Sequence, residues 1–174
     1  LMEAKKSGLV RAIGASVYGE DCALKVIHSS IFDVIQVAYS ILDQRMGATL
    51  FPAASAANVG VIIRSAFLKG VLTPRGQWLS RDLPELGKAT QSIVDSVSQT
   101  WDNLPATALR FCAAASQHAT VLIGVRDDQE LATAVDAYSS GVLSDADLEK
   151  LRGFAIQDER LLNPVNWPQD IVVN

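Results

Sequence analysis

The sequence contains few of the residues that build disulfide frameworks, metal sites or membrane spans. It has 2 cysteines and 2 histidines, and Cys22 and Cys112 lie far apart, without the spacing of metal ligands. A disulfide scaffold is therefore not expected, and a reducing cytoplasm is the location we expect. No apolar run approaches the roughly 20 residues that a membrane span requires, so we expect no membrane partner.

The chain also has no excess of basic residues. Its formal net charge is -4 and its pI is about 5.1, and no basic run or basic-aromatic stretch occurs, so a nucleic-acid partner is not expected. With 49% hydrophobic and 20% charged residues, the composition is that of a globular chain, and we predict one domain over residues 1–174. The sequence begins at Leu1, and "LMEAKKSG" has the pattern of a helix end, which suggests a fragment.

Short apolar runs alternate with helical patterns along the chain. We predict strands near Val10–Ser16, Val34–Ser40, Gly60–Arg64 and Thr120–Gly124, and helices over Glu20–Ser30, Ala48–Asn58, Leu86–Trp101, Pro105–Ser116 and Ala132–Tyr138. This alternation indicates an α/β fold with four parallel strands and outer helices. A doubly wound sheet and a (β/α) barrel both fit, although no G-x-G-x-x-G follows any strand.

Polar side chains occur in or directly after three of these apolar runs. Gln36 interrupts one run, and Arg64 and Arg126 end two others. A buried amide or guanidinium needs partners, which are either neighbouring side chains or a ligand. Because parallel strands bring their carboxyl ends to one rim, we expect these residues, with Ser16 and Ser65, to lie near one another.

Four segments resemble aldo-keto reductases: Ala4–Ser16 ("AKKSGLVRAIGAS"), Asp33–Arg45 ("DVIQVAYSILDQR"), Gly60–Thr73 ("GVIIRSAFLKGVLT") and Thr120–Leu131 ("TVLIGVRDDQEL"). They follow the order and spacing of that family. The resemblance covers nearly the whole chain but only the C-terminal half of the family's (β/α)8 TIM barrel, strands five to eight. It therefore implies a parallel half-barrel.

The resemblance also implies a cofactor, NADP or NAD, and a role for individual residues. Ser16 and Gln36 would bind the nicotinamide carboxamide, and Arg64 would stack on the nicotinamide ring. The loop under the pyrophosphate would be formed by Ser65, Ala66, Phe67 and Leu68, with Arg75 as a further phosphate contact. Gly124, Arg126 and Glu130 would lie at the adenosine end.

The chain departs from the family pattern at both ends of this implied site. Val17 replaces the usual Asn after the strand-five Ser, and Glu130 stands at a Gln position. Thr133-Ala134 replaces a Glu-Asn pair near the adenine. Asp127 stands where a Ser or Thr often meets the 2′-phosphate, and a carboxylate there would repel NADP and tolerate NAD.

The family's catalytic Asp, Tyr, Lys and His belong to strands that this sequence does not contain. The first hypothesis is therefore a fragment of an NAD(P)-dependent oxidoreductase whose intact parent acts on a small carbonyl or sugar-like substrate. The alternative is a non-catalytic half-barrel that serves as a binding or assembly module. Tyr18 and Tyr39 have no recognisable Lys or His partner, and packing is the role we expect for them. A third hypothesis, a different (β/α)8 enzyme, is disfavoured by the "RSAFLKGVL" segment.

A half-barrel leaves two strand edges and its inner face open. We expect Ile13, Val37, Ile62 and Leu122, or their neighbours, to point into the barrel. Exposed edges and apolar faces favour association. We therefore expect either pairing with the missing half or a homodimer.

Overall fold

The computed structural model describes residues 1–79, 82–115, 119–168 and 171. The strands are β1 (Gly14–Ser16), β2 (Val34–Ala38), β3 (Gly60–Arg64) and β4 (Ala119–Val121). The helices are α1 (Met2–Lys6), α2 (Glu20–His28), α3 (Leu50–Ala56), α4 (Pro84–Ile93), α5 (Leu104–Ala114), α6 (Asp128–Ser139), α7 (Asp145–Arg152) and α8 (Glu159–Leu162). A π-helical turn, Val94–Ser98, extends α4, and 3-10 turns span Leu68–Gly70, Pro74–Trp78 and Pro164–Asn166.

The four strands form one parallel sheet in the order β1-β2-β3-β4, as the alternation predicts. β3 has the predicted bounds, but β1 and β4 are only three residues long. Each of these two strands lies at an edge and pairs with a single neighbour, which shortens its hydrogen-bonded run. Arg126 therefore does not end a strand; it lies in the loop before α6, and its side chain is 62% exposed.

The two faces of the sheet differ in burial. In β2 and β3, Ile35, Val37, Val61 and Ile63 are buried in one cluster with residues of α2, α3 and α5. The alternate residues, Gln36 and Ile62 among them, are only partly buried, and Leu122 beyond β4 is 54% exposed. The prediction that Val37 points into the barrel is therefore wrong, because the two-residue period places it on the same side as Ile35. Ile62 and Leu122 are on the open face.

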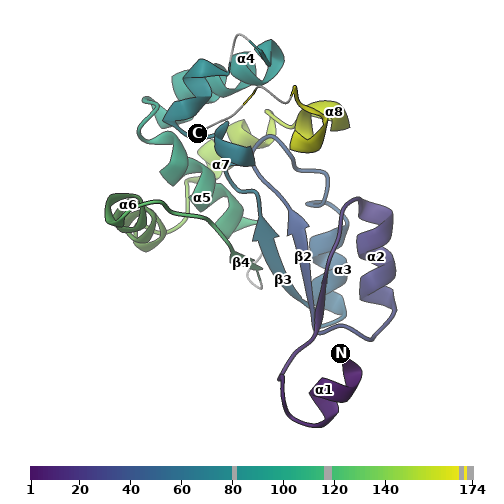
Figure 1. The fold of residues 1–174 in the computed structure, drawn as a ribbon. Coiled ribbons are helices and arrows are strands. Elements are labelled where there is room, and N and C mark those ends of the chain that lie inside the picture. Colours follow the sequence, from purple (N-terminus) through teal and green to yellow (C-terminus); the bar gives the residue numbers. More distant parts are fainter. Residues whose placement is uncertain (80–81, 116–118, 169–170, 172–174) are drawn as a thin grey trace.

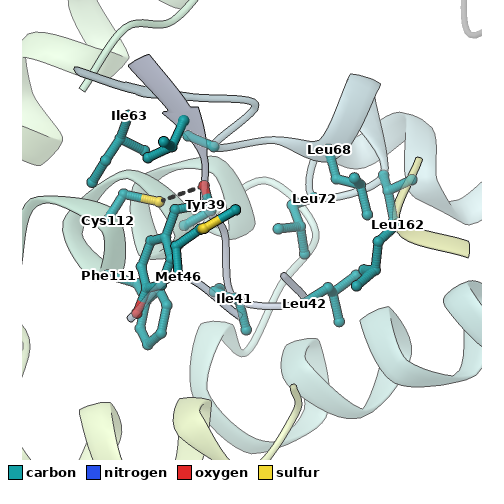
Figure 2. Packing of buried hydrophobic residues seen from close by; sticks show 14 of the residues in the cluster. Tyr39, Ile41, Leu42, Met46, Ile63, Leu68, Leu72, Phe111, Cys112 and Leu162 are labelled. Atoms are coloured by element: carbon teal, nitrogen blue, oxygen red, sulfur yellow. Dashed lines mark hydrogen bonds between the residues drawn. The ribbon is translucent and has the colours of Figure 1, made fainter. Parts of the chain in front are cut away.

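An aromatic stack joins Tyr39, the residue after β2, to α3 and α5 in the core. The Tyr39 ring lies parallel to Phe111, with centroids 5.7 Å apart, and meets Phe51 edge-on at 5.0 Å. The Cys112 thiol donates to the Tyr39 carbonyl at 3.5 Å (Figure 2). Burial raises the pKa of Tyr39 to about 12 and that of Cys112 to about 12, so both groups stay neutral at ordinary pH.

Helices α4 and α8 lie beyond the arrowheads of the strands, whereas α1 lies at the opposite end of the sheet (Figure 1). The Ser144 side chain caps α7 by accepting from the Asp147 amide. The C-terminal tail contains α8 and a 3-10 turn. It is anchored by Leu162 and Trp167, whose side chains join the core. This packing brings the tail to the carboxyl ends of the strands.

Helix α6 begins four residues earlier than Ala132, the predicted start. Asp127 is its N-cap and accepts from the Glu130 amide at 2.8 Å. The first turn of α6 therefore includes Glu130, and this places the Glu130 side chain next to Arg126. No helix of the described residues is long and apolar enough to cross a membrane.

Candidate functional site

A row of side chains crosses the open face of the sheet near the carboxyl ends of the strands. The pairing register aligns Ser16 with Gln36, Gln36 with Ile62, and Ile62 with Thr120. The Ser16 hydroxyl donates to Oε1 of Gln36 at 3.3 Å. This bond orients the amide of Gln36, whose Nε2 group has no partner among the described residues. The pair thus presents an amide donor on the open face.

One row closer to the carboxyl ends, the guanidinium of Arg64 stacks on the ring of Tyr18. The register pairs Ala38 with Arg64, and the Arg64 guanidinium carbon lies 4.2 Å from the Tyr18 ring centroid. Arg64 also donates to the Ser65 hydroxyl at 3.3 Å and to the Val17 carbonyl at 3.5 Å. None of these partners is a carboxylate, so the positive charge of Arg64 is not neutralised by an ion pair within the described residues.

The loop after β3 has an unusual backbone. Ser65, Leu68 and Lys69 have φ of 61°, 41° and 53°, in the left-handed region that non-glycine residues rarely adopt. In the part of the chain that the structure describes, the amides of Ser65, Ala66 and Phe67 donate to no protein oxygen. Successive free amides in such a loop form a concave site that favours anions.

This loop forms one wall of a cavity of about 460 Å³ at the carboxyl ends of the strands. Tyr18, Ala38 and Arg64 line it from the sheet, and Glu159, Leu162 and Asn163 line it from α8 and the tail. Asp43 and Arg45 complete the wall near α8, joined by two hydrogen bonds of 2.8 and 2.9 Å. Because Arg45 pairs with Asp43, the basic groups left to attract an anion are Arg64 and Lys69.

A second cavity, of about 600 Å³, adjoins the first. The two share Phe67, Lys69, Gly70, Ile123 and Gly124 in their walls. Apolar residues of α5 and the β4–α6 loop line the second cavity, with Arg75, Asp102, Arg126 and Glu130 among its charged groups. No atom lies within 4 Å of the position that a Cβ on Gly124 would occupy, so the cavity is open at Gly124. Together the cavities suit an elongated ligand with an anionic centre.

Arg126 and Glu130 form a closed pair at the end of the second cavity. Nε of Arg126 donates to Oε1 of Glu130 at 2.8 Å, its Nη2 donates to the same oxygen, and its backbone amide donates to Oε2 at 2.8 Å. The Arg126 guanidinium holds the pKa of the Glu130 carboxyl below its usual range. The sequence left two alternatives for the partner of each arginine, a neighbouring side chain or a ligand. For Arg126 the partner is a neighbouring side chain, Glu130.

Nine of the eleven candidate residues line these cavities. They are Arg64, Ser65, Ala66, Phe67, Leu68, Arg75, Gly124, Arg126 and Glu130. Ser16 and Gln36 lie one row deeper on the open face and line neither cavity. Tyr18 and Lys69 were missed as site residues. Lys69 directly follows the "RSAFL" loop, and its charge next to a predicted anion-binding loop was a signal that could have identified it.

The comparisons with known proteins point to one family. The sequence matches the profile of the Aldo/keto reductase family over residues 1–156. It is 29% identical to the NADH-specific methylglyoxal reductase of Escherichia coli (strain K12), over 92% of this chain and 53% of that protein.

Solved structures give the same result for the fold. The holo form of the aldo-keto reductase AKR11C1 from Bacillus halodurans superposes with a TM-score of 0.71 at 25% identity, over 89% of this chain and 54% of that one. The glycerol dehydrogenase AKR11B4 from Gluconobacter oxydans, 16% identical, has a TM-score of 0.70 over 98% and 54% of the two chains. The chain thus spans about half the length of the relatives that it matches.

Proposed function

The chain belongs to the aldo-keto reductase family, and we propose that it supplies the dinucleotide-binding half of an NAD(P)-dependent oxidoreductase. In the complete (β/α)8 protein, hydride transfer would reduce a small carbonyl compound or oxidise the corresponding alcohol. The observation that carries the proposal is the pair of adjoining cavities at the carboxyl ends of parallel strands, joined at a loop of free amides.

The residues present fit the parts of such a cofactor. The amides of residues 65–67 and the Lys69 ammonium would bind the pyrophosphate at the junction of the cavities. Gln36, oriented by Ser16, would bind the carboxamide, and Arg64 would offer the guanidinium face opposite Tyr18 to the nicotinamide ring. Arg75 would be a further phosphate contact, and Gly124, Arg126 and Glu130 would lie at the adenosine end.

When bound, the nicotinamide supplies hydride; this chain's residues supply binding and orientation. Neither tyrosine near the site is placed to act as the proton donor. Tyr39 is buried, with its pKa raised to about 12, and Tyr18 stacks on Arg64. Among the described residues no Lys or His donates to either hydroxyl. We therefore expect the purified chain to show no turnover of methylglyoxal with NADH; measurable turnover would contradict this assignment of roles.

The partner that this function requires is the rest of a barrel. The open face, with Ile62 and the 54% exposed Leu122, would pack against the missing half or against a second copy of this chain. The two free cysteines fit a reducing compartment, so the cytoplasm remains our prediction for the location.

Binding of NADH to the full 174-residue chain, followed by its fluorescence, tests the proposal. We expect saturable binding, which Lys69→Ala weakens about tenfold, because a hydrogen bond to a charged group contributes about 1.5–3 kcal/mol and Lys69 is exposed. Lys88→Ala is the matched control, since Lys88 is also exposed but lines neither cavity. Absence of binding, or equal loss in both variants, would overturn the proposal.

A further inference from the structure

Exposed apolar side chains gather beyond β4, the last strand of the sheet, along residues 122–142. They are Leu122, Val125, Leu131, Val135, Tyr138 and Val142. Leu131, Val135 and Tyr138, which we call the α6 stripe, follow at intervals of four and three residues and so share one side of the helix. Their exposed fractions lie between 50% and 69%. The apolar side of a surface helix normally packs against another element, and here that element is absent from the described residues.

The α6 stripe belongs to a helix whose position is fixed. α6 packs on α5, and Ala137, on a different side of α6 from the stripe, is buried. The C-terminal end of α6 is also held, because Nε and Nη2 of Arg110 on α5 donate to the carbonyls of Gly141 and Val142, each at 2.8 Å. A partner would therefore meet a surface that is already ordered, which lowers the cost of binding.

The opposite edge of the sheet has the complementary arrangement, a strand without a helix beyond it. The preceding helix, α1, buries no residue and lies past the end of the sheet (Figure 1). β1 consists of three small residues, Gly14–Ser16, and the segment before it exposes Leu9 and Val10. A helix with large apolar side chains packs well over a strand of small ones, because large and small residues interdigitate.

The two edges also carry opposite charges. α6 contains Asp128, Glu130 and Asp136 and no basic residue. Next to β1, Lys6 and Arg11 are exposed, in a segment of the chain that has Glu3 as its acidic residue. The α6 side of one chain is therefore attracted to the β1 side of another, whereas two α6 helices would repel each other.

We infer that a second copy of this chain covers these two surfaces, with β4 of one copy beside β1 of the other and the α6 stripe over that strand. A two-fold axis parallel to the strands forms this contact twice and closes two four-stranded sheets into one barrel. The chain spans about half the length of its relatives, as such a barrel requires. The inference rests on the proposed function for the need of a complete barrel, and it names the partner.

Sedimentation of the full chain, over a concentration range of about a hundredfold, tests the inference. Val135→Glu places a carboxylate in the α6 stripe, and Leu9→Glu places one beside β1. Ala132→Glu is the matched control, because it adds the same charge at an exposed position of α6 outside the stripe. Circular dichroism and the melting temperature show whether each variant is folded.

We expect wild type to sediment as a dimer at micromolar concentration. Val135→Glu and Leu9→Glu should each weaken dimerisation by about tenfold or more, because burying an unpaired carboxylate is costly. Ala132→Glu should resemble wild type. A mixture of Val135→Glu and Leu9→Glu chains should dimerise more tightly than either variant alone, since one of the two contacts in the mixed dimer contains neither substitution.

A folded wild type that sediments as a monomer throughout overturns the inference and points to the missing half of the barrel as the occupant. Larger assemblies overturn it as well, because they show that the contact does not close. No effect of Leu9→Glu on the dimer also overturns it, by placing the contact between two α6 helices. Binding of NADH, measured on the same samples, separates the two proposals. A monomer that binds NADH refutes the inference alone, whereas a dimer that binds none refutes the proposed function while the contact stands.

Discussion

The two neighbouring isoleucines of β3 provide a test of which sheet face is open. Ile63 is fully buried against α5, whereas Ile62 points to the opposite face and is only partly buried. Ile63→Ala removes three carbon groups worth about 0.8 kcal/mol each and leaves a cavity, so it should lower the free energy of unfolding by about 3–5 kcal/mol. In an isolated monomer, Ile62→Ala should cost about 1 kcal/mol, since less apolar surface returns to water.

The comparison becomes more informative when protein concentration varies. If the open face is covered by a second copy, Ile62→Ala removes contacts that exist only in the dimer. Its cost should then rise with concentration, whereas that of Ile63→Ala should not change. Urea unfolding followed by circular dichroism, at two concentrations a hundredfold apart and with sedimentation as a check, measures both. If Ile62→Ala costs as much as Ile63→Ala in a chain that sediments as a monomer, the assignment of the open face is wrong.

Alkaline pH should destabilise the fold, because Tyr39 and Cys112 have pKa values of about 12 in the folded chain, above their ordinary values. Both groups ionise at lower pH in the unfolded chain than in the folded chain. The free energy of unfolding should therefore fall between about pH 9 and 12, by at most about 1.4 kcal/mol per pH unit for each group. A free energy of unfolding that does not change with pH in urea titrations would refute this. A thiol reagent should modify only the exposed Cys22 in the native chain and both cysteines in denaturant, and rapid reaction of both in the native chain would contradict the burial of Cys112. Gly76→Ala should destabilise the fold by about 1–3 kcal/mol, because its new Cβ would lie 2.1 Å from the Val71 carbonyl oxygen. Gly124→Ala should leave the stability unchanged, because no atom lies within 4 Å of its new Cβ. Equal melting temperatures of the two variants would count against this packing.

The core of the sheet could be predicted from the sequence because its signals are local. The β-branched run of β3 is bounded by Gly60 and Arg64, and both bounds were predicted. The face of each residue was harder to predict, since a two-residue period defines two sets but not which set meets the helices. Val37 was assigned to the wrong set for this reason. The register resolves it, because Gln36 pairs with Ile62 and so shares its face.

The features of the site that were missed depend on backbone geometry that residue types do not specify. The bond between Arg126 and Glu130 requires α6 to start at Asp128, whereas the helix was predicted to start at Ala132. Lys69 acquires its position through a left-handed backbone, which glycine adopts readily and lysine does not. No pattern of apolar residues predicts such a conformation.

The strained loop after β3 supports the binding role proposed for this chain. Left-handed residues such as Ser65, Leu68 and Lys69 cost about 1–3 kcal/mol each when they are not glycine. The loop keeps this conformation because Ala66 and Leu68 are 1% and 2% exposed and anchor it to the core. This conformation leaves three consecutive amides free beside Lys69, where the two cavities meet. An anion at that junction would receive donors already oriented before it binds, so little of its binding energy would be spent on ordering the loop.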